Sequence, residues 1–330
     1  ISPHAFWDNL PKADLHFFAN VLPDFDSPQL GLSGQIELRN NAPAPADKNG
    51  IPLRDLTGNF AINESGAVSI ENLLAHTAKN GKVSVDGGIY TQKKTLNLNV
   101  AVSNLTAADV LAQDFAGKLD GTVNLSGAFD APVASFKLDT GFAKTAGLVS
   151  LRTDKRGGQQ TVVLEKGEIL PPNGGKLNVA ATLELFKDQK IQADIISSGF
   201  NPQKLYPELP VGNINGRVRL NGLLAKTVFH ADMQFAPSVV QGAALSGAGK
   251  VSYENGHLSR ADTNIRLGDN VLMTQGSFGK KGNTLALNLN APALQQFGFG
   301  MRGALSAKGT LTNTADGWTQ LEACLLYTSD

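Results

Sequence analysis

The sequence has little of what disulfides, metal centres and membrane-spanning helices require. It contains one cysteine and five histidines in 330 residues, and the histidines stand far apart. No window of 18 or more apolar residues occurs, so we expect no membrane-spanning helix in this stretch. The 29 basic and 29 acidic residues cancel, which leaves no net field to attract nucleic acid. We therefore expect no metal ion, no cofactor and no nucleic-acid partner.

Catalytic motifs are also scarce. No serine stands in the Gly-x-Ser-x-Gly pattern of a nucleophile elbow. The glycine-rich segment 298–303 has the spacing of a dinucleotide-binding loop, but it leads into an alternating strand pattern, whereas such a loop opens a helix. Paired carboxylates that meet only in space leave no signature in a sequence. We predict that the chain is not an enzyme.

The dominant positive signal is an alternation of apolar and polar residues with period two. In residues 96–102 the leucines and valines fall on one face of an extended strand, and asparagine and alanine fall on the other. Clusters of Gly, Asn and Asp punctuate about twenty such runs and are typical of hairpin turns. The pattern predicts an all-β fold. We expect an elongated, mostly antiparallel sheet of repeated strands that is curled into a trough.

Helical signals are few and short. Residues 106–115 begin with a capping threonine, Thr106, followed three residues later by Asp109, and this pattern predicts a helix of about three turns. Residues 202–209 and 292–297 are candidates for single helical turns at corresponding places. No strand–helix–strand alternation supports a Rossmann or barrel enzyme fold.

A repeat appears when the strands are aligned. Residues 117–127 and 212–222 share every glycine and apolar position, and residues 303–309 form a weaker third copy. We therefore predict repeat-like units near 30–116, 117–211, 212–302 and 303–323, all within one elongated β-repeat domain over residues 1–323. The alternative is a chance recurrence in a glycine-rich β protein.

The two ends predict that the chain is an internal fragment. Residues 1–10 carry neither a starting methionine nor a cationic leader. Residues 324–330 resemble the translation of a sequencing adapter, so we expect them to be a non-native tail. The alternative is an ordinary C-terminal strand.

The apolar face of the strands needs a partner. It is built mainly of Leu, Val, Ile and Ala, and a curled sheet would turn it into a continuous aliphatic groove suited to acyl chains. Alternation alone leaves open a closed solenoid whose apolar face packs on itself. Twelve residues are predicted to line the groove: Leu96, Leu98, Val100, Val102, Leu119, Val123, Leu125, Val218, Leu220, Leu285, Leu287 and Leu289.

The segments GTVNLSGAFDAP (residues 121–132), GRVRLNG (216–222) and GALSAKG (303–309), with the alternating strands between them, resemble the TamB family and more loosely AsmA-like proteins. The resemblance covers roughly residues 14–323. The second copy has Lys226 and Thr227 near the place of Pro132, which weakens the motif. TamB is the inner-membrane subunit of the translocation and assembly module.

The resemblance implies a β-taco-like periplasmic body of a protein that is anchored in the inner membrane of a Gram-negative bacterium, with the anchor outside this fragment. It implies phospholipid transport towards the outer membrane, support for the assembly of autotransporters and other outer-membrane proteins, and a BamA-like outer-membrane partner of the TamA type. No catalytic site comes with it. Two alternatives are a strand-edge scaffold or chaperone for nascent outer-membrane barrels and a surface β-solenoid adhesin.

Overall fold

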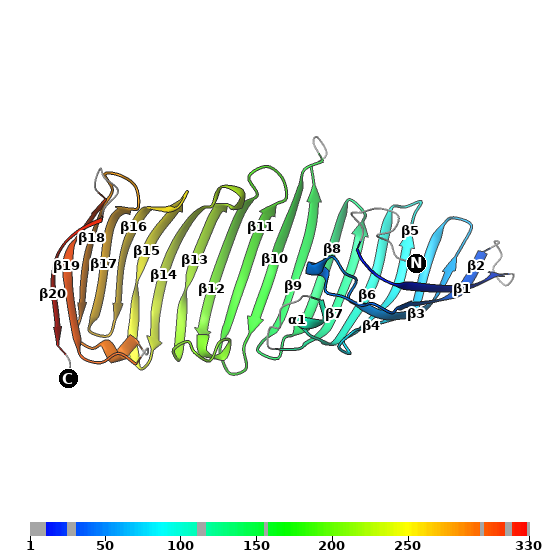
Figure 1. The fold of residues 1–330 in the computed structure, drawn as a ribbon, viewed down its shortest axis with the longest axis horizontal. Helices are drawn as coiled ribbons and strands as arrows, with labels where there is room; N and C mark the ends of the chain where they lie inside the picture. The colour runs from blue at the N-terminus through cyan, green and yellow to red at the C-terminus, as the bar shows by residue number, and fades with distance from the viewer. Residues whose placement is uncertain are drawn as a thin grey trace. The chain divides into compact units, whose positions relative to one another are not determined.

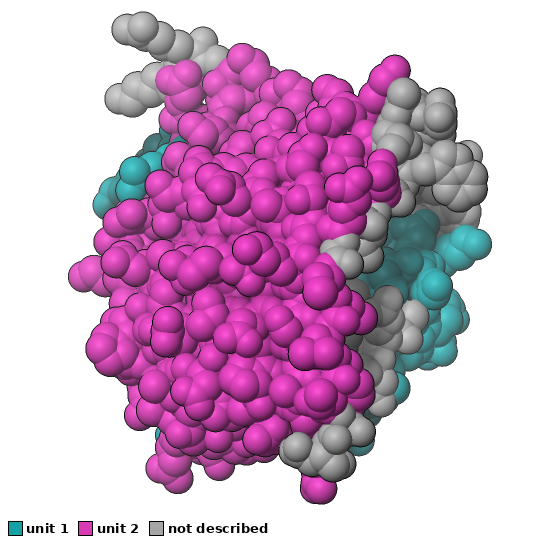
Figure 2. Space-filling model, turned by 90° about the vertical axis from the view of Figure 1, so that its left-hand side faces the viewer, with its two compact units in different colours: residues 1–152 teal, residues 153–330 magenta. Residues whose placement is uncertain are grey.

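The structure is a computed structural model, and it describes residues 11–24, 31–110, 117–154, 158–297, 300–313 and 319–328. The chain divides into two compact units, Ile1–Arg152 and Thr153–Asp330, which are coloured separately in Figure 2. The strands of the first unit are β1 (Leu15–Asp24), β2 (Gly31–Asn40), β3 (Leu53–Ile62), β4 (Ala67–Thr77), β5 (Lys82–Tyr90), β6 (Thr95–Leu105), β7 (Leu119–Ala128), β8 (Ala131–Asp139) and β9 (Lys144–Thr153).

The second unit has eleven strands in its described residues. They are β10 (Gln160–Leu170), β11 (Lys176–Glu184), β12 (Lys190–Phe200), β13 (Gly212–Leu223), β14 (Val228–Val240), β15 (Ala243–Glu254), β16 (His257–Leu267), β17 (Asn270–Phe278), β18 (Thr284–Ala291), β19 (Ala304–Asn313) and β20 (Thr319–Thr328). Strand β20 includes Cys324, and whether residues 324–330 are native stays a prediction.

Within each unit, every strand pairs antiparallel with the next strand along the chain (Figure 1). The sheet of each unit is curled and does not close on itself. Tight turns suffice for this topology, because antiparallel neighbours need no crossover connection. The prediction of an all-β, mostly antiparallel curled sheet with few short helices is confirmed. The predicted repeat units stay a prediction.

Burial follows the alternation that is visible in the sequence. In β6, Leu96, Leu98 and Val100 are half-buried, whereas Asn97 and Asn99 between them are exposed. Because successive side chains of a strand point to opposite faces, each sheet has one aliphatic face and one polar face.

The helical segments are short and lie in the connections. Three of them follow β6, β12 and β18: α1 (Ala107–Val110), η3 (Pro202–Lys204) and η5 (Leu294–Phe297). Two others are η2 (Ala46–Lys48), after β2, and η4 (Leu224–Lys226), after β13. The strands of each sheet end along two opposite lines. We call the line of strand ends that carries α1 in unit 1, and η3 and η5 in unit 2, the helical edge, and the opposite line of strand ends the hairpin edge. In Figure 1 the helical edge of unit 2 is the lower one.

The helix predicted for residues 106–115 lies partly outside the described residues. The structure describes α1 over Ala107–Val110, and residues 111–116 are not described. The single turns predicted within 202–209 and 292–297 correspond to η3 and η5.

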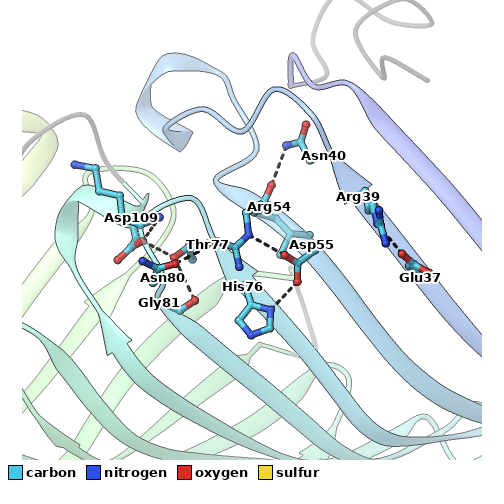
Figure 3. Close-up of polar contacts among 12 residues, drawn as sticks. Glu37, Arg39, Asn40, Arg54, Asp55, His76, Thr77, Asn80, Gly81 and Asp109 are labelled. Atoms are coloured by element: carbon cyan, nitrogen blue, oxygen red, sulfur yellow. Dashed lines mark hydrogen bonds and ion pairs between the residues drawn. The ribbon is translucent and has the colours of Figure 1, made fainter.

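A buried carboxylate fastens α1 to an earlier hairpin of unit 1. Asp109 is 2% exposed and accepts hydrogen bonds from the backbone N–H and hydroxyl of Thr106, both at 2.7 Å, and from the backbone N–H of Lys79 at 3.1 Å. The hydroxyl of Thr77 also donates to it (Figure 3). Thr77 ends β4 and Lys79 lies in the turn that follows, so the loop after β6 is tied to the hairpin two strands before it.

Asparagines do the same for the helical turns of unit 2. The side-chain amide of Asn270 donates to the carbonyl of Ala293 and to Oε1 of Gln296, both at 2.9 Å, and its oxygen accepts from the N–H of Ala293 at 3.0 Å. The N–H of Asn201, beside η3, donates to the carbonyl of Gly174 at 2.8 Å, in the turn between β10 and β11. These bonds hold η5 and η3 against the sheet.

Most fully buried side chains of unit 2 lie towards the helical edge. A cluster of Val240, Ala243, Leu245 and Leu267 is packed against the half-buried Ile214, Phe235, Ile265 and Phe297. Phe297 belongs to η5, so this turn covers the end of the aliphatic face.

Two glycines of the sequence repeat share one structural role. Gly121 has φ of +144°, and a side chain there would meet Cα of Leu138 on β8 at 2.8 Å. A side chain on Gly216, 95 positions later, would meet the carbonyl oxygen of Gln234 on β14 at 2.5 Å. Glycine allows the next strand to approach closely at both places.

Candidate functional site

The aliphatic face of each sheet is the candidate functional site. In unit 1, β6 and β7 set Leu98 opposite Leu125 and Val100 opposite Val123. These pairs extend across further strands into rows of cross-strand neighbours that contain no charged side chain. Val100 faces Val85 on β5, and Val123 faces Phe136 on β8. Rows of cross-strand neighbours thus join into one continuous apolar surface.

Seven of the predicted lining residues lie together on this face of unit 1. All seven are half-buried and share the face that carries Val100. They are Leu96, Leu98, Val100, Val102, Leu119, Val123 and Leu125.

The five predicted residues of unit 2 share a face, but they form two separate groups. Val218 and Leu220 lie on β13, whereas Leu285, Leu287 and Leu289 lie on β18. Four strands separate the groups. The register connects them: the row from Val218 passes through Met233, Gly249, Thr263 and Thr274 and reaches Leu287.

The prediction missed the residues that link these groups. Met233, Ile265 and Leu272 lie on the same face, but on each of their strands alanine or threonine takes an adjacent position of that face. Their strands therefore lack the uninterrupted Leu–x–Leu pattern. They could have been found by assigning every second position of each strand to the aliphatic face, whatever the size of the side chain there.

The opposite face of unit 2 is polar and carries a ladder of alternating charge. Asp194, Arg219, Asp232, Lys250 and Asp262 are direct cross-strand neighbours on β12 to β16. Three hollows, of about 270, 360 and 470 Å³, lie against the polar faces; polar side chains such as Asn97, Asp194 and Lys308 contribute to their respective walls.

The clustered titratable groups of unit 1 support its fold at the surface. Asp55 lies 2.6 Å from Nδ1 of His76 and accepts a hydrogen bond from Nε of Arg54 at 2.8 Å (Figure 3). Burial raises the pKa of Asp55, but the hydrogen bonds and charges of Arg54 and His76 outweigh burial and hold it below its ordinary value of 3.8. This group joins β3 to β4.

Two further observations concern membranes and metals. No helix in the described part of the chain is long and apolar enough to cross a membrane. Among the same residues, no group of three or more His, Cys, Asp or Glu side chains is placed to hold a metal ion.

Comparison with known proteins gives one positive result. The family model described as TamB, N-terminal domain, matches residues 143–316, just over half of the chain. No curated protein and no solved structure gives a significant match. The match spans most of unit 2, including the aliphatic rows from β13 to β18. On this match, the chain belongs to the TamB family.

Proposed function

We propose that the aliphatic faces of the two units bind the acyl chains of phospholipids and carry them towards the outer membrane, without enzymatic chemistry. Membership of the TamB family links the chain to the translocation and assembly module. In our proposal the chain is a periplasmic segment of an inner-membrane-anchored protein. Its outer-membrane partner is a BamA-like protein of the TamA type.

One observation carries the proposal: the rows of the aliphatic face run across strand after strand of each unit without a charged side chain. An ionised group facing hydrocarbon would be costly, so its absence from these described rows suits a lipid-binding surface. Each methylene that leaves water contributes about 0.8 kcal/mol, so an acyl chain has enough apolar surface to offset the cost of ordering it.

The side chains on this face are half-buried, which also supports the proposal. Leu98, Val100 and Leu287 are neither fully exposed nor packed into a closed core. Fully buried side chains gather towards the helical edge of unit 2 instead. An acyl chain would complete the burial that the sheet leaves unfinished.

Site-specific photo-crosslinking in the full-length protein tests the proposal. A photoreactive residue at Leu98 or Leu287 is expected to crosslink to phospholipid. The same residue at Asn99 or Asn288, one position along on the polar face, is the matched control and should not. Equal lipid crosslinking from both faces, or none from the aliphatic face, would contradict the proposal.

A second candidate function is a scaffold that offers a strand edge to nascent outer-membrane barrels, and β1 favours it. Phe17, Phe18 and Leu22 are 56%, 64% and 60% exposed, and β1 pairs only with β2 among the described strands of its unit. Such an edge can pair with an extended segment of another protein. In the crosslinking experiment, protein adducts from Phe18 that persist when Leu98 is made polar would support the scaffold.

A further inference from the structure

The polar face of unit 1 carries a hollow of about 270 Å³ near the hairpin edge. Three small residues in one cross-strand row line it: Ala61 on β3, Ser69 on β4 and Gly88 on β5. Asn97 on β6 is the next neighbour in the row and also lines the hollow. Because side chains alternate along a strand, this row lies on the face opposite to Leu98. The hollow is therefore separate from the aliphatic face.

Tyr90 supplies the aromatic part of the hollow. It follows Gly88 by two residues on β5, so both lie on the polar face. A Cβ atom on Gly88 would lie 2.9 Å from the hydroxyl oxygen of Tyr90, and 3.0 and 3.3 Å from Cζ and Cε2 of its ring. Gly88 is buried, whereas Tyr90 is 42% exposed. Glycine thus lets the ring lie against the strand, and the rest of the ring is open to a ligand.

The turn beside Tyr90 is fixed by hydrogen bonds. The side-chain oxygen of Asn63 accepts from the N–H of Ala67 at 3.0 Å, and the N–H of Gly66 donates to the carbonyl of Asn63 at 2.9 Å. The hydroxyl of Thr91, the residue after Tyr90, donates to the carbonyl of Gly66 at 2.9 Å. These bonds join the turn between β3 and β4 to the turn between β5 and β6. This end of the hollow is therefore preorganised, which lowers the cost of ordering it around a ligand.

Two side chains of the row have hydrogen-bonding groups to spare. Among the described residues, neither the hydroxyl of Ser69 nor the side-chain amide of Asn97 is bonded to another protein group. Both side chains are exposed. They lie one strand to either side of Gly88, so their Cα atoms are about 10 Å apart at ~4.8 Å per strand. A ligand that lies over Gly88 is within reach of both groups.

The walls of the hollow are uncharged. None of the described residues that line it is acidic or basic. By contrast, Asp194 and Arg219 line one of the other two hollows, and Asp262 and Lys308 line the other. A phosphate or a carboxylate in the hollow of unit 1 would lose water without gaining a cation. The hollow therefore favours a neutral ligand.

The chemistry of the walls narrows the ligand to a saccharide. A sugar ring has a C–H face, which suits the negatively polarised face of an aromatic ring, and hydroxyls that both donate and accept hydrogen bonds. Ser69 and Asn97 offer donors and acceptors of the matching kind. An apolar ligand would bury these two groups without partners. A peptide strand pairs with the edge of a sheet, whereas this hollow lies on its face.

We propose that the hollow binds one ring of a neutral saccharide, which stacks on Tyr90 and forms hydrogen bonds with Ser69 and Asn97. The proposal goes beyond acyl-chain binding, because it assigns a second class of ligand to the opposite face of unit 1. It does not depend on the lipid function, and the two are tested separately.

Titration of the purified chain with trisaccharides, followed by saturation-transfer difference NMR, tests the proposal. Maltotriose and the trimer of N-acetylglucosamine are the neutral probes, and trigalacturonate is the charged probe. The chain should bind at least one neutral probe with a dissociation constant on the order of 1 mM, as suits a shallow site. The C–H protons of one sugar ring should receive the largest saturation. Trigalacturonate should bind more weakly, because the described walls offer its carboxylates no cation.

Matched variants locate the site. Tyr90→Ala should weaken binding about tenfold because it removes the stacking surface, and Tyr90→Phe, which keeps the ring, should bind within about twofold of the wild type. Asn97→Ala, at an exposed strand position, should weaken binding about two- to tenfold, and it keeps the test available if Tyr90→Ala does not fold. Tyr206→Ala and Asn290→Ala remove exposed side chains of the same two types from unit 2 and should bind as the wild type does.

The remaining outcomes overturn the proposal. If the wild-type chain binds neither neutral probe, or binds trigalacturonate more tightly, the hollow is not a site for neutral saccharides. If Tyr90→Ala and Asn97→Ala bind as well as the wild type, the saccharide lies elsewhere on the chain. An equal loss in Tyr206→Ala or Asn290→Ala would also contradict the proposed site. None of these results bears on lipid crosslinking from Leu98, which lies on the opposite face.

Discussion

At the scale of single residues, the fold depends on short polar side chains that satisfy loop backbone groups. The side chains of Asp109, Asn201 and Asn270 accept hydrogen bonds from backbone N–H groups in the loops that follow β6, β12 and β18. Each also connects its loop with another element of the sheet or with a neighbouring turn. Buried polar groups are tolerated only when their hydrogen bonds are complete. These residues should therefore contribute more to stability than their small size suggests.

Replacing Asp109 by asparagine should lower the free energy of unfolding at pH 7 and make that free energy less sensitive to acid pH. Burial raises the pKa of Asp109, but hydrogen bonds from Thr77, Thr106 and Lys79 outweigh burial and hold it below 3.8. Because the folded-state pKa is depressed, the stabilisation is complete above the unfolded-state pKa and is lost as pH falls through the folded-state value. Asp109→Asn should cost about 1–3 kcal/mol at pH 7.

Urea unfolding between pH 7 and pH 3 measures both effects. The wild-type chain should lose more unfolding free energy below about pH 4 than the Asp109→Asn variant. Glu71→Gln, at an exposed carboxylate on β4, is the control and should follow the wild-type curve. Parallel pH curves for the wild-type chain and Asp109→Asn would show that this carboxylate is not a source of the acid sensitivity.

The sequence predicted one of these residue-scale contacts and could not predict the others. Thr106 followed by Asp109 is a local capping pattern, and the structure contains that pair. The bonds of Asp109 to Thr77 and Lys79 join residues about thirty positions apart. They depend on which hairpin lies beside the loop, which no local pattern specifies. The same holds for Asn270 and Gln296.

At the scale of the strand, side chains on the polar face help to set the register. Arg219, Asp232, Lys250 and Asp262 alternate in sign across neighbouring strands. Opposite charges directly across an antiparallel pair are favourable, and like charges are unfavourable. A slip of one residue would break the ladder and also expose the aliphatic face, so both faces favour the same pairing.

Reversing one charge in the ladder should destabilise unit 2. Lys250→Glu would place three acidic side chains in a row with Asp232 and Asp262, at an expected cost of about 1 kcal/mol. Lys308→Glu, opposite Asn288 on β18, makes the same change without an acidic neighbour there and is the control.

Thermal unfolding at low and high salt distinguishes repulsion from other causes. The loss of melting temperature caused by Lys250→Glu should shrink at 1 M salt, where the screening length falls to about 3 Å. If this loss of melting temperature does not depend on salt, or if Lys308→Glu causes an equal loss, the ladder does not act through charge.

Alternation predicted the strands and their faces well, because period two follows directly from strand geometry. All twelve predicted lining residues lie on aliphatic faces. The fold-over of η5 was not predicted. Phe297 is one apolar residue in a connection, and only the three-dimensional path of residues 292–297 brings it over Leu245 and Leu267.

At the scale of the whole molecule, binding and transport should respond differently to a local block. Each unit has its own aliphatic face, so in our proposal lipid binding is a sum over separate places. Transport towards another membrane uses those places in series in our proposal. One damaged place should therefore lower binding in part and stop transport altogether.

Leu98→Asp and Leu287→Asp in the full-length protein test this difference. Each places a carboxylate in an aliphatic row, where contact with an acyl chain is strongly unfavourable. Each should reduce the phospholipid that copurifies with the protein by a fraction, and the double variant should reduce it further. Either single variant should abolish transfer of pulse-labelled phospholipid to the outer membrane in cells that depend on this protein.

Asn99→Asp and Asn288→Asp add the same charge to the polar faces of the same strands, and both should bind and transport as the wild type does. Circular dichroism and thermal unfolding must show that all variants keep their β structure. If Leu98→Asp and Leu287→Asp bind less lipid yet transport at the wild-type rate, the aliphatic faces store lipid and do not conduct it. The serial mechanism would then be wrong, while acyl-chain binding would remain.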